Sequence, residues 1–156
     1  MNQLDIRDVF FDKLYELGSQ NSNIIVISAD MDAFSLRKFA TDFPKQYMNI
    51  GVSEQNMINV AAGLAIAGKI VFCYSIASFA TIRCLEQIKV NICSMKLPVT
   101  IIGAGAGFSF GYDGPTHHGH QDVSSMRLMP EMNIIELSSN DVAESALDYV
   151  IETRNP

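Results

Sequence analysis

Short apolar runs rich in β-branched residues, separated by segments of helical periodicity, constrain the fold of this chain most strongly. Such runs are typical of strands buried on both faces of a parallel sheet, and they occur at residues 24–27, 70–73, 99–102 and 133–135. Between them, apolar residues recur at helical spacing and predict helices over residues 4–17, 54–67, 79–94 and 140–152. Gly18 follows the first of these helices, where a C-terminal glycine commonly sits. Strands that alternate with helices predict an α/β fold with an open, mostly parallel sheet and helices on both faces.

Length and charge fit one domain over residues 1–156. A chain of 156 residues with 48% hydrophobic residues can bury a sizeable core. The net charge is −6 and Lys and Arg are scattered, so the chain lacks the basic footprint of a protein that binds nucleic acid or an anionic membrane surface. No apolar run approaches the roughly 20 residues of a membrane-spanning helix, and the amino terminus does not resemble a signal peptide. We therefore expect a soluble, cytoplasmic protein.

The cysteines predict packing rather than cross-linking. Cys73, Cys84 and Cys93 are odd in number, lack Cys-x-x-Cys spacing and lie in apolar segments. We expect reduced, buried side chains.

Glu54 is the first candidate for chemistry. Ser53 precedes the predicted helix and is expected to cap it, which leaves Glu54 in the first turn. An acid there has an ordinary explanation, because it interacts favourably with the helix dipole by about 0.3–1 kcal/mol. However, Glu54 also follows an apparent strand at 47–50, and ligand sites in such folds lie at the carboxyl ends of strands.

A long loop over residues 103–120 is the second candidate, since loops of this length in compact domains are usually functional. Its glycine-rich opening differs from a dinucleotide fingerprint, because Phe108 stands where the third glycine belongs and no helix is expected there. The loop contains His117, His118 and His120, which are all the histidines of the chain.

Two further interpretations of this loop remain open. The three histidines, with Asp113 and Asp122 nearby, suggest a metal cluster. Against this, adjacent histidines tend to point apart and no second ligand pair stands at familiar spacing. Alternatively, a histidine of the loop exchanges protons with a substrate oxygen.

Several motifs occur in a familiar order. They are Gly-Val-Ser-Glu-Gln-Asn-Met at 51–57, Ala-Ala-Gly-Leu-Ala at 61–65 and Asp-Gly-Pro-Thr-His-His-Gly at 113–119, supported by Ser-Ala-Asp at 28–30 and the segment 79–87. Together they resemble the central, pyrimidine-binding domain of transketolases and 1-deoxyxylulose-5-phosphate synthases. The resemblance extends from about residue 4 to the end of the sequence. The 51–57 and 79–87 segments look closer to split transketolases, whereas the His-His-Gly ending looks closer to the synthases.

The resemblance implies the thiamine diphosphate-binding fold and a set of cofactor contacts. In this family the acid matching Glu54 hydrogen-bonds N1′ of the aminopyrimidine, favouring the imino tautomer that deprotonates thiazolium C2. Phe79 is expected to stack on the pyrimidine ring, although a buried core Phe is the plain alternative. Ile76 and Ile82 stand where transketolases often carry further aromatic residues, and are expected at the same pocket. Asp30 resembles a residue near the cofactor and the subunit interface, although an acid after a strand is also an ordinary turn residue.

The resemblance also implies substrate contacts. His117 resembles the histidine that contacts carbonyl or hydroxyl oxygens of the substrate, and Asp113 resembles the acid that binds a sugar hydroxyl. His118, in the same His-His-Gly ending, is expected beside them. The substrate class implied is a sugar phosphate or a related ketose.

The family's diphosphate site is absent from this sequence. Relatives hold the diphosphate through a divalent metal, in a domain recognised by Gly-Asp-Gly, which does not occur here; hard oxygen ligands suit Mg²⁺. The last predicted helix also ends where another strand would be due, so the domain looks shortened. We expect a chain that binds only the pyrimidine half of the cofactor and holds no metal itself. It would be inactive without a diphosphate-binding partner, within a homo- or hetero-oligomer. The alternative is a noncatalytic interaction or regulatory module that retains the fold.

Overall fold

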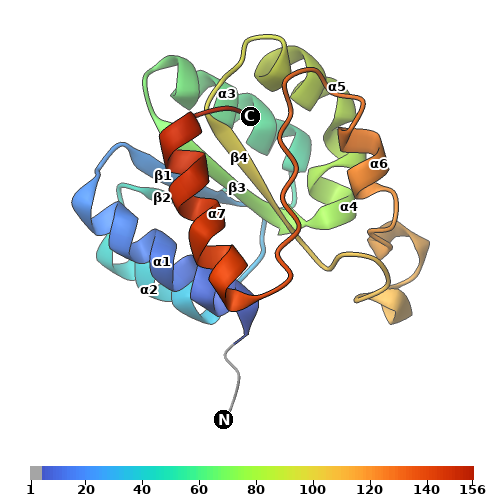
Figure 1. The fold of residues 1–156 in the computed structure, drawn as a ribbon, viewed down its shortest axis with the longest axis horizontal. Helices are drawn as coiled ribbons and strands as arrows, with labels where there is room; N and C mark the ends of the chain where they lie inside the picture. Colours follow the sequence, from blue (N-terminus) through green and yellow to red (C-terminus); the bar gives the residue numbers. More distant parts are fainter. Residues whose placement is uncertain (1–4) are drawn as a thin grey trace.

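The computed structural model describes residues 5–156, which form a parallel sheet between two layers of helices (Figure 1). The sheet has four strands in the order β2-β1-β3-β4, and every neighbouring pair is parallel. The strands are β1 (Ile24–Ser28), β2 (Tyr47–Asn49), β3 (Ile70–Ile76) and β4 (Val99–Ala104). The predicted open α/β fold is therefore confirmed.

The two central strands are buried along nearly their whole length. Every residue of β1 is buried, and in β3 only the last, Ile76, is partly exposed. This explains why both read as continuous apolar runs, since helices cover the sheet on both faces. In contrast, β4 lies at the edge of the sheet and pairs only with β3.

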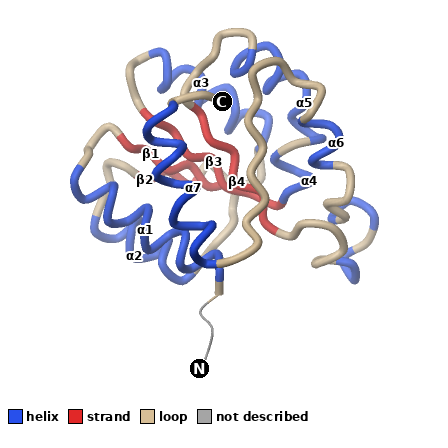
Figure 2. Tube along the Cα trace, in the orientation of Figure 1, coloured by secondary structure: helices blue, strands red, loops and turns tan. Residues whose placement is uncertain are grey.

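Helices cover both faces of the sheet, as Figure 2 shows. The α-helices are α1 (Ile6–Gln20), α2 (Phe34–Asp42), α3 (Glu54–Ile66), α4 (Ala77–Ala80), α5 (Leu85–Gln87), α6 (Asp122–Met126) and α7 (Asn140–Thr153). The other helical segments are the 3₁₀ helices η1 (Ile82–Cys84), η3 (Gly111–Asp113) and η4 (Pro115–His117) and the π-helix η2 (Ile88–Cys93). No helix within residues 5–156 is both long and apolar enough to cross a membrane.

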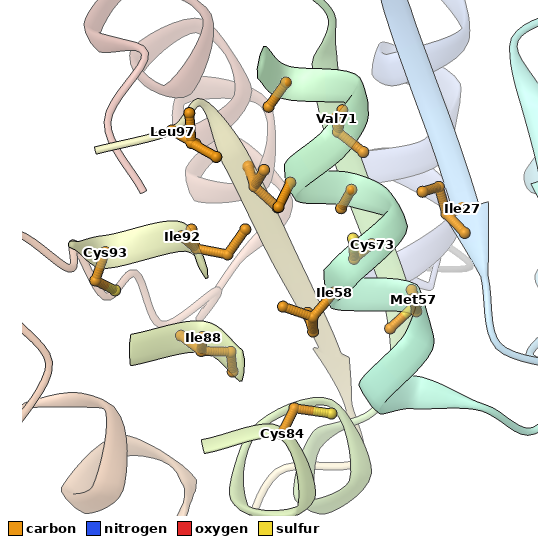
Figure 3. Close-up of a cluster of buried hydrophobic side chains, with 14 of the residues drawn as sticks. Ile27, Met57, Ile58, Val71, Cys73, Cys84, Ile88, Ile92, Cys93 and Leu97 are labelled. Carbon is orange, nitrogen blue, oxygen red and sulfur yellow. The ribbon is translucent and has the colours of Figure 1, made fainter. Parts of the chain in front are cut away.

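Each face has its own hydrophobic cluster. Helices α1, α2 and α7 pack on one face, where the ring of Phe11 meets that of Tyr74 edge-on at 4.9 Å between centroids. Helix α3 and the segment from η1 to η2 pack on the other face (Figure 3). Cys73, Cys84 and Cys93 all belong to this second cluster as free, buried thiols, which confirms their predicted packing role.

Helix α1 continues past the glycine expected to end it. Gly18 lies inside the helix, which ends at Gln20, and Leu4 lies outside the described residues. The prediction for Gly18 was wrong because its role is close packing. A Cβ on Gly18 would lie 2.5 Å from Cε2 of Phe39, a core residue of α2.

The single helix predicted over residues 79–94 was also wrong. The segment is divided into α4, η1, α5 and η2, with a break at Thr81, whose φ and ψ are −111° and −78°. The hydroxyl of Thr81 donates to the carbonyl oxygen of Ala77 at 2.6 Å, a back-bond that often bends helices. The periodicity of this segment gave only part of its buried face correctly. Ile88 and Ile92 are buried, whereas Leu85, at the same helical spacing, is 37% exposed.

The strand predicted over residues 133–135 does not form. Ile134 and Ile135 are about two-fifths exposed, and the backbone N–H of Asn133 donates to the carbonyl oxygen of Pro156 at 2.9 Å. A cavity of about 560 Å³ is lined both by β4 and by residues 132–137, so this extended segment does not close against the strand. No strand within residues 5–156 pairs with this run, and β-propensity alone does not make a strand, because it depends on packing context.

Candidate active site

The candidate residues gather at the carboxyl ends of the parallel strands. Asp30 follows β1, Glu54 follows β2 across a short loop, and Phe79 follows β3. The loop that carries His117 follows β4. Helix α2 connects β1 to β2 on one face, and α3 connects β2 to β3 on the other, so the strand order reverses between β1 and β3. Ligands of open α/β sheets bind at such a switch point.

Glu54 is a buried carboxylate in the first turn of α3, with only 2% of the residue exposed. Its Oε2 lies 2.8 Å from Nη1 of Arg83, and its Oε1 accepts a hydrogen bond of 3.3 Å from the hydroxyl of Ser75, at the end of β3. The predicted side-chain cap by Ser53 is wrong. Its hydroxyl donates instead to the carbonyl oxygen of Ile50 at 2.9 Å, which fixes the loop ahead of the helix.

Arg83 connects Glu54 to the aromatic part of the site. Its guanidinium carbon lies 3.7 Å from the centroid of the Phe79 ring, and that ring meets the ring of His117 edge-on at 4.8 Å between centroids. Glu54, Arg83, Phe79 and His117 therefore form one continuous row of contacts. Because buried charges are costly unless paired, Arg83 supplies the countercharge that Glu54 requires.

Sequence reasoning assigned no role to Arg83. Two signals pointed to it: it stands four residues after Phe79, about one helical turn, and Glu54 was expected to be screened from water and so to need a partner. The partner could not be identified because 29 residues separate the two side chains along the chain.

The loop carrying His117 is held against the α4 segment. Ser78 of α4 donates its hydroxyl to the carbonyl oxygen of Thr116 at 2.7 Å, and the Thr116 hydroxyl lies 3.1 Å from Nδ1 of His117. Further along, the backbone N–H of Gly119 donates to the carbonyl oxygen of Gly107 at 2.7 Å, which closes the loop on itself. His117 is thereby positioned with its ring partly exposed beside Phe79.

The neighbouring loop residues point elsewhere. The ring of His118 packs against Phe108 at 4.7 Å, and His120 stacks on the same Phe108 ring at 5.3 Å. Adjacent His117 and His118 therefore face different partners, as expected. The carboxylate of Asp113 is exposed and makes no hydrogen bond or ion pair within residues 5–156.

The remaining predicted residues are not among the contacts that make up this row. Asp30 is exposed with a left-handed φ of 56°, and its backbone N–H donates to Oδ1 of Asn49 at 3.2 Å. Ile76 is half-buried at the end of β3, and Ile82 is 36% exposed.

The three histidines do not form the ligand cluster that a metal site would need. Among the described residues, no three His, Cys, Asp or Glu side chains are placed to share a metal ion. The rings of His118 and His120 lie near each other, and their centroids are 6.2 Å apart.

Nearly the whole chain matches a known protein family. The family described as transketolase, pyrimidine binding domain, matches residues 2–156. The chain belongs to this family. It is 36% identical over 135 residues to an apulose-4-phosphate transketolase subunit of Phocaeicola vulgatus, covering 86% of the chain and 43% of that relative. It is 41% identical over 139 residues to a 1-deoxy-D-xylulose-5-phosphate synthase of Desulfotalea psychrophila, covering 87% of the chain and 21% of the synthase.

A solved structure agrees with this assignment. The chain matches a split gene transketolase, described as an inactive beta4 tetramer, with a TM-score of 0.84 and 34% sequence identity. The match covers 97% of this chain and 48% of the solved one. The transketolase-type pyrimidine domain and its fold are thus established, and the chain spans less than half the length of these relatives.

Proposed function

We propose that this chain is the pyrimidine-binding part of a thiamine diphosphate-dependent enzyme that transfers ketol groups. The observation that carries the proposal is the buried carboxylate of Glu54, joined to the face of Phe79 through the guanidinium of Arg83, at the carboxyl edge of the sheet. When bound, the cofactor supplies the electron sink for breaking the bond next to a ketose carbonyl.

The site is compatible with a flat aromatic ring whose nitrogen shares a proton with a carboxyl group. The planar guanidinium of Arg83 already contacts the Phe79 face while donating to Glu54, so both groups accept a planar N–H donor at the same time. We assign Glu54 to the hydrogen bond with the pyrimidine nitrogen and Phe79 to stacking on the ring. Ile76 and Ile82 are assigned to the apolar wall, and Asp30 to the margin of the cofactor site.

The loop after β4 is assigned to the substrate. His117, held next to Phe79 and partly exposed, is proposed to hydrogen-bond a carbonyl or hydroxyl oxygen of a ketose or sugar phosphate. The exposed carboxylate of Asp113 is proposed to bind a sugar hydroxyl. His118 is proposed to contact the substrate too, although its ring packs against Phe108 in this structure.

A partner chain is proposed to hold the diphosphate and its Mg²⁺. The sequence has no Gly-Asp-Gly motif, one relative is named as a subunit of a transketolase, and another as a split gene transketolase. Large apolar side chains are exposed in the loops at the same edge of the sheet as Glu54, namely Val52, Phe108 and Tyr112. Exposed aromatic and apolar groups of this kind commonly mark protein interfaces.

Calorimetry tests this proposal. Thiamine diphosphate with Mg²⁺ is titrated into the chain alone, and into the chain mixed with a diphosphate-binding transketolase chain from the same source. Binding only in the mixture is the expected result. A partner complex that forms without binding the cofactor would favour the noncatalytic interaction module instead.

A further inference from the structure

Arg83 makes both contacts that the proposed function assigns to the aminopyrimidine ring. Its guanidinium donates to Oε2 of Glu54 at 2.8 Å, and it lies 3.7 Å from the centroid of the Phe79 ring. One carboxylate and one aromatic face are thus engaged by one planar group of this chain.

A guanidinium resembles an aminopyrimidine in the properties that matter here. Both groups are flat, carry N–H groups in their plane and stack on aromatic faces. The guanidinium pairs with the carboxylate through its own N–H, and the ring nitrogen pairs with it through one shared proton. We propose that Arg83 is an internal competitor for the pyrimidine pocket, which engages Glu54 and Phe79 until the ring displaces it. This inference rests on the proposed function, because it takes the ring as the ligand of that pocket.

The local structure permits such an exchange. The Arg83 side chain is 39% exposed, whereas that of Glu54 is only 3% exposed, so the guanidinium can turn into solvent while the carboxylate cannot. The main chain at Arg83 is held, because Gln55 donates its side-chain amide to the Arg83 carbonyl oxygen at 3.0 Å and the next residue, Cys84, is fully buried. Displacement therefore requires only a change of side-chain rotamer.

The exchange also keeps Glu54 paired. Its other partner is Ser75, whose hydrogen bond of 3.3 Å is long for a hydroxyl donor. A buried carboxylate with that contact alone would be poorly compensated. Arg83 thus stabilises the pocket before the ring arrives, and the ring nitrogen, which shares one proton with the carboxyl group, then takes over as the partner of Glu54.

Competition of this kind lowers the apparent affinity for the ring. A pocket engaged by Arg83 in about nine molecules of ten would bind the ring about tenfold more weakly than an open one. Removing the guanidinium should therefore tighten binding, the opposite of what is expected for a residue that holds the cofactor.

The first measurement needs neither cofactor nor partner. Urea unfolding of this chain is compared for Glu54→Gln, Arg83→Met and the double variant, since methionine keeps an unbranched apolar stem without the charge. We expect the double variant to be clearly more stable than the sum of the single changes predicts. Strict additivity would show that the ion pair is not formed in solution and would overturn the inference.

The second measurement is calorimetric titration of thiamine diphosphate with Mg²⁺ into the chain together with its diphosphate-binding partner. Arg83→Met should bind about tenfold more tightly than the unaltered chain. Arg83→Lys, which keeps the charge but not the planar group, should bind more tightly than the unaltered chain too. Arg127→Met, a change at an exposed arginine outside the site, should leave the affinity unchanged.

The outcomes separate the two proposals. Weaker binding by both Arg83 variants would make Arg83 a cofactor-holding residue and would refute the competitor role, while the proposed function would stand. No binding by the unaltered chain, with clear coupling between Glu54 and Arg83 in the unfolding cycle, would reject the proposed function and the competitor role together.

Discussion

Replacing Gly119 by alanine is expected to destabilise the fold by about 1–3 kcal/mol, the usual cost of overpacking. A Cβ at Gly119 would lie 2.7 Å from the backbone oxygen of Gly105, and 3.4 Å from both Cα of Ala106 and Cβ of Ala77. Two of these three neighbours are backbone atoms, which cannot move aside as a flexible side chain could. The added methyl group should therefore displace the loop that positions His117, and this displacement should lower the free energy of unfolding.

Gly63→Ala is the matched control. Gly63 lies inside α3, and a Cβ there meets nothing within 4 Å. The same substitution at this position should stabilise the protein by about 1 kcal/mol, because alanine has a higher helix propensity than glycine by that amount. Neither glycine has a positive φ, so backbone strain does not separate the two variants.

Urea unfolding of the free chain measures both variants, with thermal melting as a second probe. In a protein of this size each kcal/mol shifts Tm by about 2–4 °C, downward for Gly119→Ala and upward for Gly63→Ala. In limited proteolysis, the protease should also cut the loop over residues 103–120 faster in Gly119→Ala than in the unaltered chain. If Gly119→Ala were as stable and as resistant to protease as the unaltered chain, the close packing of this loop would be refuted.

Three further predictions concern the core and the surface. Burial raises the pKa of the Cys84 thiol to about 12, so this thiol stays protonated and unreactive at pH 8. A thiol reagent should therefore label all the cysteines only after the protein is unfolded. Rapid labelling of the native protein would contradict their burial. Ile88→Ala, at a fully buried site, should cost about 2–5 kcal/mol in urea unfolding, whereas Val90→Ala, at a half-exposed site, should stay within about 0.5 kcal/mol; equal effects would contradict the orientation of η2. Lys96→Met removes an exposed ion pair with Glu131 and should change the free energy of unfolding by about 0–1 kcal/mol, so a larger loss in the same assay would show that the pair is more rigid than its exposure implies.

The sheet could be predicted from the sequence because its central strands are buried on both faces. Strands β1 and β3 therefore read as unbroken apolar runs, and the helices between them show their buried faces at regular spacing. The same signal failed at residues 133–135, where an apolar run is present but does not pair with β4, from which a cavity separates it. It failed again at Thr81, where the helix breaks and the hydroxyl bonds back to Ala77. Ile88 and Ile92 beyond the break still face the core, whereas Leu85 does not.

The candidate site was predictable only in part. Glu54, Phe79 and His117 stand in motifs that resemble a known family, and the structure brings them into one row. Arg83, which joins them, was not assigned, because the partner of a buried acid depends on tertiary packing. The different directions of His117 and His118 are likewise set by their contacts with Phe79 and Phe108.

We propose above all that Glu54 acts on the pyrimidine ring of the cofactor. The most direct test of this proposal is the rate at which the C2 proton of thiamine diphosphate exchanges with solvent deuterium, followed by NMR in the complex of this chain with its diphosphate-binding partner. Glu54→Gln should slow this exchange by about 10²–10⁴-fold, the usual contribution of a positioned acid or base. Glu86→Gln, at an exposed acid, is the control that should leave the rate unchanged. An unchanged exchange rate in Glu54→Gln with the cofactor still bound would contradict the account.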